Sequence, residues 1–191
     1  MSTSTIVFIP TSAERAHQLV AAPGKQVTAF TVTEELHSIL DVTDPEETEH
    51  AAMVIGSVWG LTHTGRRLVL VAHVPPEQIT DHEEVDNGGV TLTHLEPSQI
   101  TAWFADDDDA HSREAAEAVK GMTIDDAWND VTIQTLIGEH ELSWHDVTEE
   151  LPAVSTDPEG SAVLSDADRL AWSGVVFSER PTSRCQHPVA C

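Results

Sequence analysis

The sequence predicts an α+β fold: a mixed, mostly antiparallel sheet with helices packed mainly on one face. Strand-like and helix-like runs alternate at the start of the chain. After residue 66, however, three strand-like runs follow one another with no helix between them, which is typical of neighbouring antiparallel strands. Hydrophobic residues make up 40% of the 191 residues, enough for one sizeable core.

The first elements are short and bounded by clear signals. The run TIVFI (5–9) is β-rich and closed by Pro10, which predicts a strand. SAERAHQLVA follows with apolar residues at helical spacing, and Thr11 or Ser12 can cap that helix. Residues 27–32 predict a second strand, and TEELHSIL predicts a short helix capped by Thr33.

The clearest helix start lies at residues 44–47. Asp44 is the expected N-cap, Pro45 the first helical residue and Glu47 the partner of a capping box. We expect Gly60 to end this helix. Its predicted buried stripe is Ala52, Ile55, Val58 and Trp59.

Strands dominate the next forty residues. RRLVLVAHV (66–74) is almost continuously apolar and β-branched, which favours a central strand closed by two prolines. The turn signal DNGG (86–89) precedes VTLTHL, which alternates as a strand does. ITAWFA (100–105) predicts a further strand.

The remaining elements alternate again. We expect a helix from the aspartate run to about residue 122 and a second helix over 124–136 capped by Thr123. A last strand is predicted in HELSW (140–144). A short helix is predicted in DVTEEL, with Asp146 as its cap and Glu149 as the capping-box partner. Leu142 should share one face of that strand with Trp144. We place four tryptophans on core faces: Trp59, Trp103, Trp128 and Trp144.

The composition changes near residue 152. Residues 1–152 predict a compact acidic domain, and residues 153–191 predict a Pro/Gly/Ser-rich linker, one short amphipathic helix and a flexible tail. Residues 153–191 contain five acidic and three basic residues, so nearly all of the net charge lies on the predicted domain.

The net charge of -24 limits the partners of this chain. A negative field repels phosphate backbones and anionic lipid, so nucleic acid and membranes are disfavoured, whereas a basic protein or a divalent cation is favoured. Solubility or adaptation to salt would produce the same composition. The only cysteines are Cys185 and Cys191, and no apolar run suits a signal peptide or a membrane span, so we expect a cytoplasmic protein.

The run of four aspartates, Asp106–Asp109, is open to two interpretations. Carboxylates at a helix start cap free N–H groups and suit the helix dipole. Oxygen-rich clusters also bind divalent cations, and the candidate ligands here are Asp106, Asp108, Asp109 and His111, although their spacing differs from a calcium loop. We favour the helix start and keep a divalent-cation site as the alternative.

Other candidate residues are weaker. His140 and His145 lie among acidic residues, but positions five apart on a strand point to opposite faces, so surface histidines are favoured over a site. CQHPVAC offers three soft ligands where structural zinc needs four. In the tail, Leu170, Trp172 and Val176 form an apolar set that could dock on its own domain or bind a partner.

Signatures of common enzymes are absent. The sequence has no glycine-rich phosphate loop, no G-x-S-x-G and no H-E-x-x-H, and it contains no tyrosine. These absences favour a protein that is not an enzyme.

Several segments, taken in order, resemble a small family of uncharacterised actinobacterial proteins (a domain of unknown function, DUF6912-like). They are VFIPTS, TAFTVTEEL, RLVLVAHVP, ITAWFADDDDA and GEHELSWHDVTEELP, and the resemblance covers about residues 5–152. His145 stands where the family usually has a tyrosine. The resemblance implies a single intracellular domain and brings no activity or cofactor with it.

These observations leave three functional hypotheses. The first is a non-enzymatic acidic module that binds a basic protein or regulates it. The second is a divalent-metal-dependent hydrolase that uses Asp106–Asp109 with a histidine such as His111 or His140. The third is a mimic of nucleic acid that competes for a basic protein.

Overall fold

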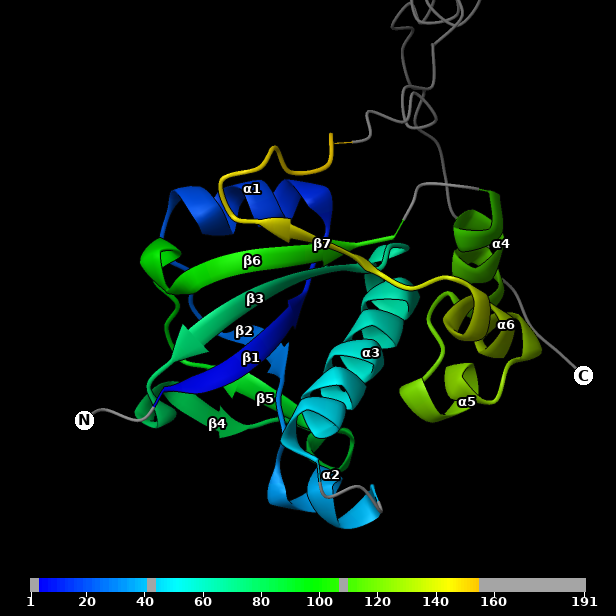
Figure 1. The fold of residues 1–191 in the computed structure, drawn as a ribbon, viewed down its shortest axis with the longest axis horizontal. Coiled ribbons are helices and arrows are strands. Elements are labelled where there is room, and N and C mark those ends of the chain that lie inside the picture. The colour runs from blue at the N-terminus through cyan, green and yellow to red at the C-terminus, as the bar shows by residue number, and fades with distance from the viewer. Residues whose placement is uncertain (1–3, 41–43, 107–109, 155–191) are drawn as a thin grey trace, which may run out of the picture. The chain divides into compact units, whose positions relative to one another are not determined.

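The described part of the chain forms one seven-stranded antiparallel sheet with helices on both faces (Figure 1). The computed structural model describes residues 4–40, 44–106 and 110–154, all within the compact unit Met1–Ser155. The predicted α+β class is therefore confirmed, and every pairing in the sheet is antiparallel. The predicted boundary at 152 and the tail helix stay predictions, because the tail lies outside the described residues.

The strand order is β4-β5-β2-β1-β3-β6-β7. The strands are β1 (Thr5–Pro10), β2 (Val27–Phe30), β3 (Leu68–Val74), β4 (Ile79–Asp81), β5 (Gly89–Leu92), β6 (Ile100–Ala105) and β7 (Ser143–Asp146). The α-helices are α1 (Ala13–Ala21), α2 (Glu34–Ile39), α3 (Pro45–Thr64), α4 (Ala110–Val119), α5 (Ile124–Trp128) and α6 (Val131–Glu139). The apolar strand β3 lies between β1 and β6, away from both edges, as its sequence predicts.

The helix caps follow the sequence signals. The side chains of Ser12, Thr33 and Thr123 each accept the backbone N–H three residues on, at the starts of α1, α2 and α5. Asp44 caps α3 by accepting the N–H of Glu46, with Pro45 as the first helical residue.

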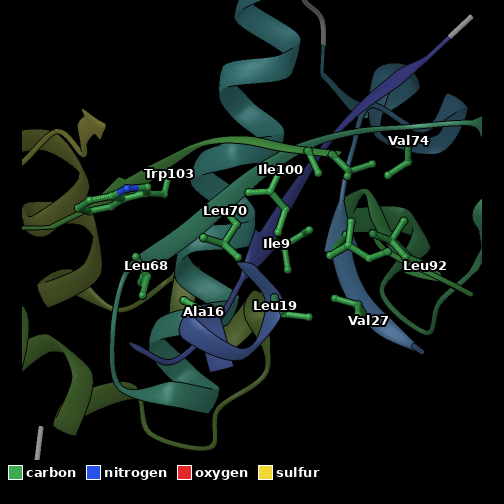
Figure 2. Close-up of a cluster of buried hydrophobic side chains, with 14 of the residues drawn as sticks. Ile9, Ala16, Leu19, Val27, Leu68, Leu70, Val74, Leu92, Ile100 and Trp103 are labelled. Atoms are coloured by element: carbon green, nitrogen blue, oxygen red, sulfur yellow. The ribbon is translucent and has the colours of Figure 1, made fainter. Parts of the chain in front are cut away.

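One face of the sheet is covered by α1 (Figure 2). Ala16 and Leu19 of α1 pack on a cluster that includes Ile9, Leu70 and Trp103. The segment after β7 covers this face too, because Leu151 is buried in the same cluster and the Pro152 carbonyl contacts His17 Nε2 at 3.2 Å.

The other face carries most of the helix. α3 packs on Phe8, Phe30 and Val71, and its C-terminal half joins α4, α5 and α6 in a third cluster through Val58 and Leu61. The helices therefore lie mainly on this face, with α1 alone on the other (Figure 1).

Three predicted boundaries are wrong. α3 continues past Gly60 to Thr64 and ends at Gly65, which adopts a left-handed φ of 71°. Gly60 serves close packing instead: a Cβ there would lie 3.1 Å from both the Pro10 Cβ and the Arg66 carbonyl oxygen. The helix predicted over 124–136 is two helices, because Asp130 caps a new one by accepting the N–H of Thr132.

The third wrong boundary is the helix predicted in DVTEEL. Asp146 ends β7, and a turn follows in which the Asp146 carboxylate accepts the N–H of Thr148. The Glu149 carboxylate accepts the N–H of Asp146 at 2.8 Å. The predicted capping partners therefore meet, but they close a turn. The short strand β4 was not predicted.

Candidate functional site

Asp106, the first residue of the aspartate run, forms a buried ion pair and hydrogen bonds at the end of β6. Its side chain is 8% exposed, its Oδ2 lies 3.5 Å from Arg67 Nη1, and it accepts a hydrogen bond from Ser112 Oγ at 2.8 Å. The Asp106 N–H also donates to the Arg67 carbonyl. Asp108 and Asp109 lie outside the described residues, so the proposed metal site and the helix cap both stay predictions.

Arg67 is the buried cation of this region, with 2% of its side chain exposed. It donates to the His140 carbonyl at 3.1 Å, so it connects the start of β3 with the end of α6. Burial lowers the pKa of Arg67, and the Asp106 carboxylate opposes that shift. Its Nε has no hydrogen-bond partner within the described part of the chain.

His111 and His140 come together, with ring centroids 5.5 Å apart. They line a cavity of about 270 Å³ between α4 and α6, with Glu114 and Glu139 at its border. Nevertheless, no three His, Cys, Asp or Glu side chains of the described residues gather closely enough to bind a metal ion.

His145 does not join His140. Its ring stacks on Trp103 on the α1 face, with centroids 3.9 Å apart, and its Nδ1 lies 3.3 Å from Glu149 Oε2. The pKa of Glu149 is lowered by the backbone N–H of Asp146 and, second, by His145. The pKa of Asp146 is lowered by the hydroxyl and the N–H of Thr148. These contacts stabilise the turn after β7 and create no reactive group.

A groove of about 440 Å³ lies on the α3 face, and we call it the β7 groove. Its floor is apolar and comes from four adjacent strands, β1, β3, β6 and β7. The floor residues are Ile6, Phe8, Val71, Ala102, Phe104 and Trp144.

One wall of the β7 groove is a stripe of α3. Glu46, Glu49, His50 and Met53 stand at positions i, i+3, i+4 and i+7 of that helix, so they share one face. His73 of β3 adds a second imidazole to the rim. Among the residues that the structure describes, no lysine or arginine lines this groove.

Trp144 is 59% exposed, so its predicted place on a core face is wrong. The strand pairing explains the difference. Trp144 lies opposite Phe104 on the edge strand β7, on the α3 face, where the floor of the groove is open. The other three predicted tryptophans are buried or partly buried.

Sequence reasoning missed the β7 groove because its residues lie far apart in the chain, from Ile6 to Trp144. The one available signal was the pairing of Glu46 with His50 on a single helix face, which the structure places on the groove wall. The predicted partner-binding residues Leu170, Trp172 and Val176, and the CQHPVAC ligands, lie outside the described residues.

Comparisons with known proteins give a family and no activity. No helix in the described part of the chain combines the length and apolar character needed to cross a bilayer. Neither the curated proteins nor the solved structures contain a match. A family model described as "Family of unknown function (DUF6912)" matches residues 5–154, which include every described strand and helix. The chain therefore belongs to this family of unknown function.

Proposed function

We propose that this chain is a non-enzymatic acidic module that binds another protein through the β7 groove. The observation that carries the proposal is a groove whose apolar floor includes the exposed Trp144. Tryptophans of this kind are enriched among the residues that dominate binding energy at protein interfaces. The groove leaves part of the apolar surface of the sheet open to solvent.

The charge of the molecule supports a basic partner. The rim offers Glu46 and Glu49 as its charged residues, and the whole chain carries a net charge of -24. A negative surface raises the rate of encounter with positive partners and repels acidic ones. We infer a cytoplasmic setting, since only two cysteines occur in the chain and both follow residue 184.

The two other hypotheses receive less support. A metal-dependent hydrolase would need the Asp106 carboxylate as a ligand, yet that group is committed to Arg67 and Ser112. A nucleic-acid mimic would present carboxylates alone, whereas the β7 groove presents an apolar floor.

The test is affinity capture with the full chain from its native cell extract, at low and at moderate salt. Three baits are compared: the wild type, Trp144→Ala, and Val131→Ala as a matched control. Val131 is 76% exposed and lies at the other cavity, so it reports on exposed apolar residues in general. We expect one stoichiometric partner that the wild type and Val131→Ala retain and Trp144→Ala loses. A partner retained equally by all three baits, or no partner at all, contradicts the proposal.

A further inference from the structure

We propose that the ligand of the β7 groove is a short amphipathic helix with basic flanking side chains, supplied by a partner protein. This inference rests on the proposed function and specifies the class of partner. It follows from the dimensions of the floor, the nature of its walls, the closure of the β7 edge and the charge of the rim.

The floor has the length of a short helix. It crosses four adjacent strands, β1, β3, β6 and β7. Three spacings of ~4.8 Å give about 14 Å across the floor. At ~1.5 Å per residue, about nine or ten residues of helix cover that distance and present about three apolar side chains at i, i+3 or i+4, and i+7.

The walls suit a helix as well. α4, α5 and α6 pack against Val58 and Leu61, in the C-terminal half of α3. The N-terminal half instead borders the groove with the stripe from Glu46 to Met53. A ligand helix laid on the floor would pack against this stripe and against the sheet, as α3 itself packs on the sheet.

An extended ligand strand fits poorly. β7 pairs with β6 on one side, so its other side is the edge where a strand would add. The turn after β7 closes that edge at one end. The N–H of Asp146 donates to Glu149 Oε1 at 2.8 Å, and the carbonyl of Asp146 accepts the N–H of Glu149 at 3.0 Å. Only a very short stretch of β7 is left for pairing, which limits the edge as a template.

The charge of the rim selects among possible occupants. A second copy of this chain would bring its own Glu46 and Glu49 against the same residues, so like charges would meet. The apolar segment of the chain's own tail, LSDADRLAWSGVV, contains two aspartates and one arginine, so it is acidic too. Lysines or arginines flanking an apolar stripe complement the rim, and their long aliphatic stems can cover apolar surface.

The test uses a defined probe with the full-length chain. The probe is a synthetic Leu/Lys peptide of about 14 residues with its leucines at helical spacing. Two peptides of the same length serve as comparisons: one alternates Leu and Lys strictly, as a strand does, and one replaces every Lys with Glu. Binding of the fluorescently labelled peptides is measured by anisotropy over a range of salt concentrations.

Four variants locate the contact. Trp144→Ala and the double variant Glu46→Gln/Glu49→Gln change the β7 groove. Val131→Ala and Glu114→Gln/Glu139→Gln make the same kinds of change at the cavity between α4 and α6. All of these side chains are exposed or partly exposed, so the folded state should tolerate each change.

We expect the helical Leu/Lys peptide to bind the wild type at least tenfold more tightly than either comparison peptide. Trp144→Ala should weaken that binding about tenfold or more, as expected of a central tryptophan. Glu46→Gln/Glu49→Gln should weaken it and reduce its salt dependence, while both control variants bind as the wild type does.

Three results would overturn the inference: equal binding of the strand-patterned peptide, equal weakening by the control variants, or tighter binding when Trp172 is replaced by Ala. The last would assign the groove to the chain's own tail. The capture experiment separates the two proposals. If Trp144→Ala loses a captured partner but the peptide fails these tests, the result supports the binding module and contradicts the helical ligand.

Discussion

The two faces of the sheet differ in how completely they are covered. On the α1 face, Leu70, Ala72 and Val74 of β3 are fully buried beneath α1 and the chain after β7. On the α3 face, Ile6 of β1 and Phe104 of β6 are partly exposed on the floor of the β7 groove, and Trp144 of β7 is 59% exposed there. The α1 face of β3 is thus fully covered, whereas the α3 face keeps an open groove toward the edge strand β7.

Because of this difference, we expect one face of the sheet to determine stability and the other to determine binding. The closed face contributes apolar burial, which stabilises the fold by roughly 25 cal/mol per Å² removed from water. The apolar side chains on the groove floor stay partly in contact with water in the free chain. A ligand that covers them would gain the free energy of their burial. Substitutions on the closed face should therefore change the free energy of unfolding, and substitutions in the groove should change binding.

The largest expected effect comes from Leu70→Ala on the closed face. Leu70 is fully buried, and removing such a side chain leaves a cavity that the surroundings fill only partly. We expect the free energy of unfolding to fall by about 3 kcal/mol, measured by urea denaturation. Val131→Ala is the control, since Val131 is 76% exposed, and its effect should stay within about 0.5 kcal/mol. A loss below about 1 kcal/mol for Leu70→Ala would contradict the closed face.

The second effect concerns Asp106, which binds Ser112 of α4 and, through Arg67, is connected to the end of α6. Asp106→Asn removes the charge that compensates the buried Arg67 guanidinium while preserving the shape of the side chain. Loss of a charged partner costs about 2 kcal/mol. Thermal or urea denaturation should show this loss for Asp106→Asn and almost none for Asp81→Asn, whose carboxylate is exposed at the edge strand β4. Equal stability of the two variants would show that the ion pair is dispensable.

Much of the fold could be predicted from local signals. Asp44 with Pro45, Thr33 and Thr123 mark helix starts because their side chains or fixed φ act within one turn. The continuous apolar run of β3 predicts an interior strand because both of its faces pack against helices. Such signals depend on residues three or four positions apart, so one sequence reveals them.

The wrong predictions concern features that depend on contacts between distant parts of the chain. Gly60 looks like a helix end, but its lack of a side chain serves the approach of Pro10, which is fifty positions earlier. Trp144 alternates correctly with its neighbours, yet whether its face is covered depends on where α3 to α6 end. The β7 groove unites four strands and a helix, so no local pattern could have predicted it.

A third, smaller effect concerns the N-cap of α1, the helix that covers the α1 face. Ser12 accepts the N–H of Arg15 at 3.2 Å, and Ser12→Ala removes that acceptor. We expect a loss of about 1 kcal/mol in the free energy of unfolding. Ser98→Ala, at an exposed serine of the turn before β6, should be neutral within about 0.5 kcal/mol. If Ser12→Ala is equally neutral, the closure of this face does not depend on the cap.

The smallest expected effect on stability is also the one that most sharply separates the two faces. Trp144→Ala removes a large aromatic side chain, but 59% of that side chain is exposed, and what it loses is mainly a cross-strand contact with Phe104 at the sheet edge. Such a pair is worth about 0.5 kcal/mol, so urea denaturation should barely distinguish this variant from the wild type.

The result for Trp144 decides how its exposure is interpreted. A loss above about 2 kcal/mol would show that Trp144 stabilises the sheet, and binding defects of the same variant would then reflect partial unfolding. A near-neutral result means that an exposed aromatic residue contributes little to the folded domain. The apolar surface of the β7 groove is then available to a ligand at almost no cost in stability, whereas Leu70 on the same sheet is committed to the core.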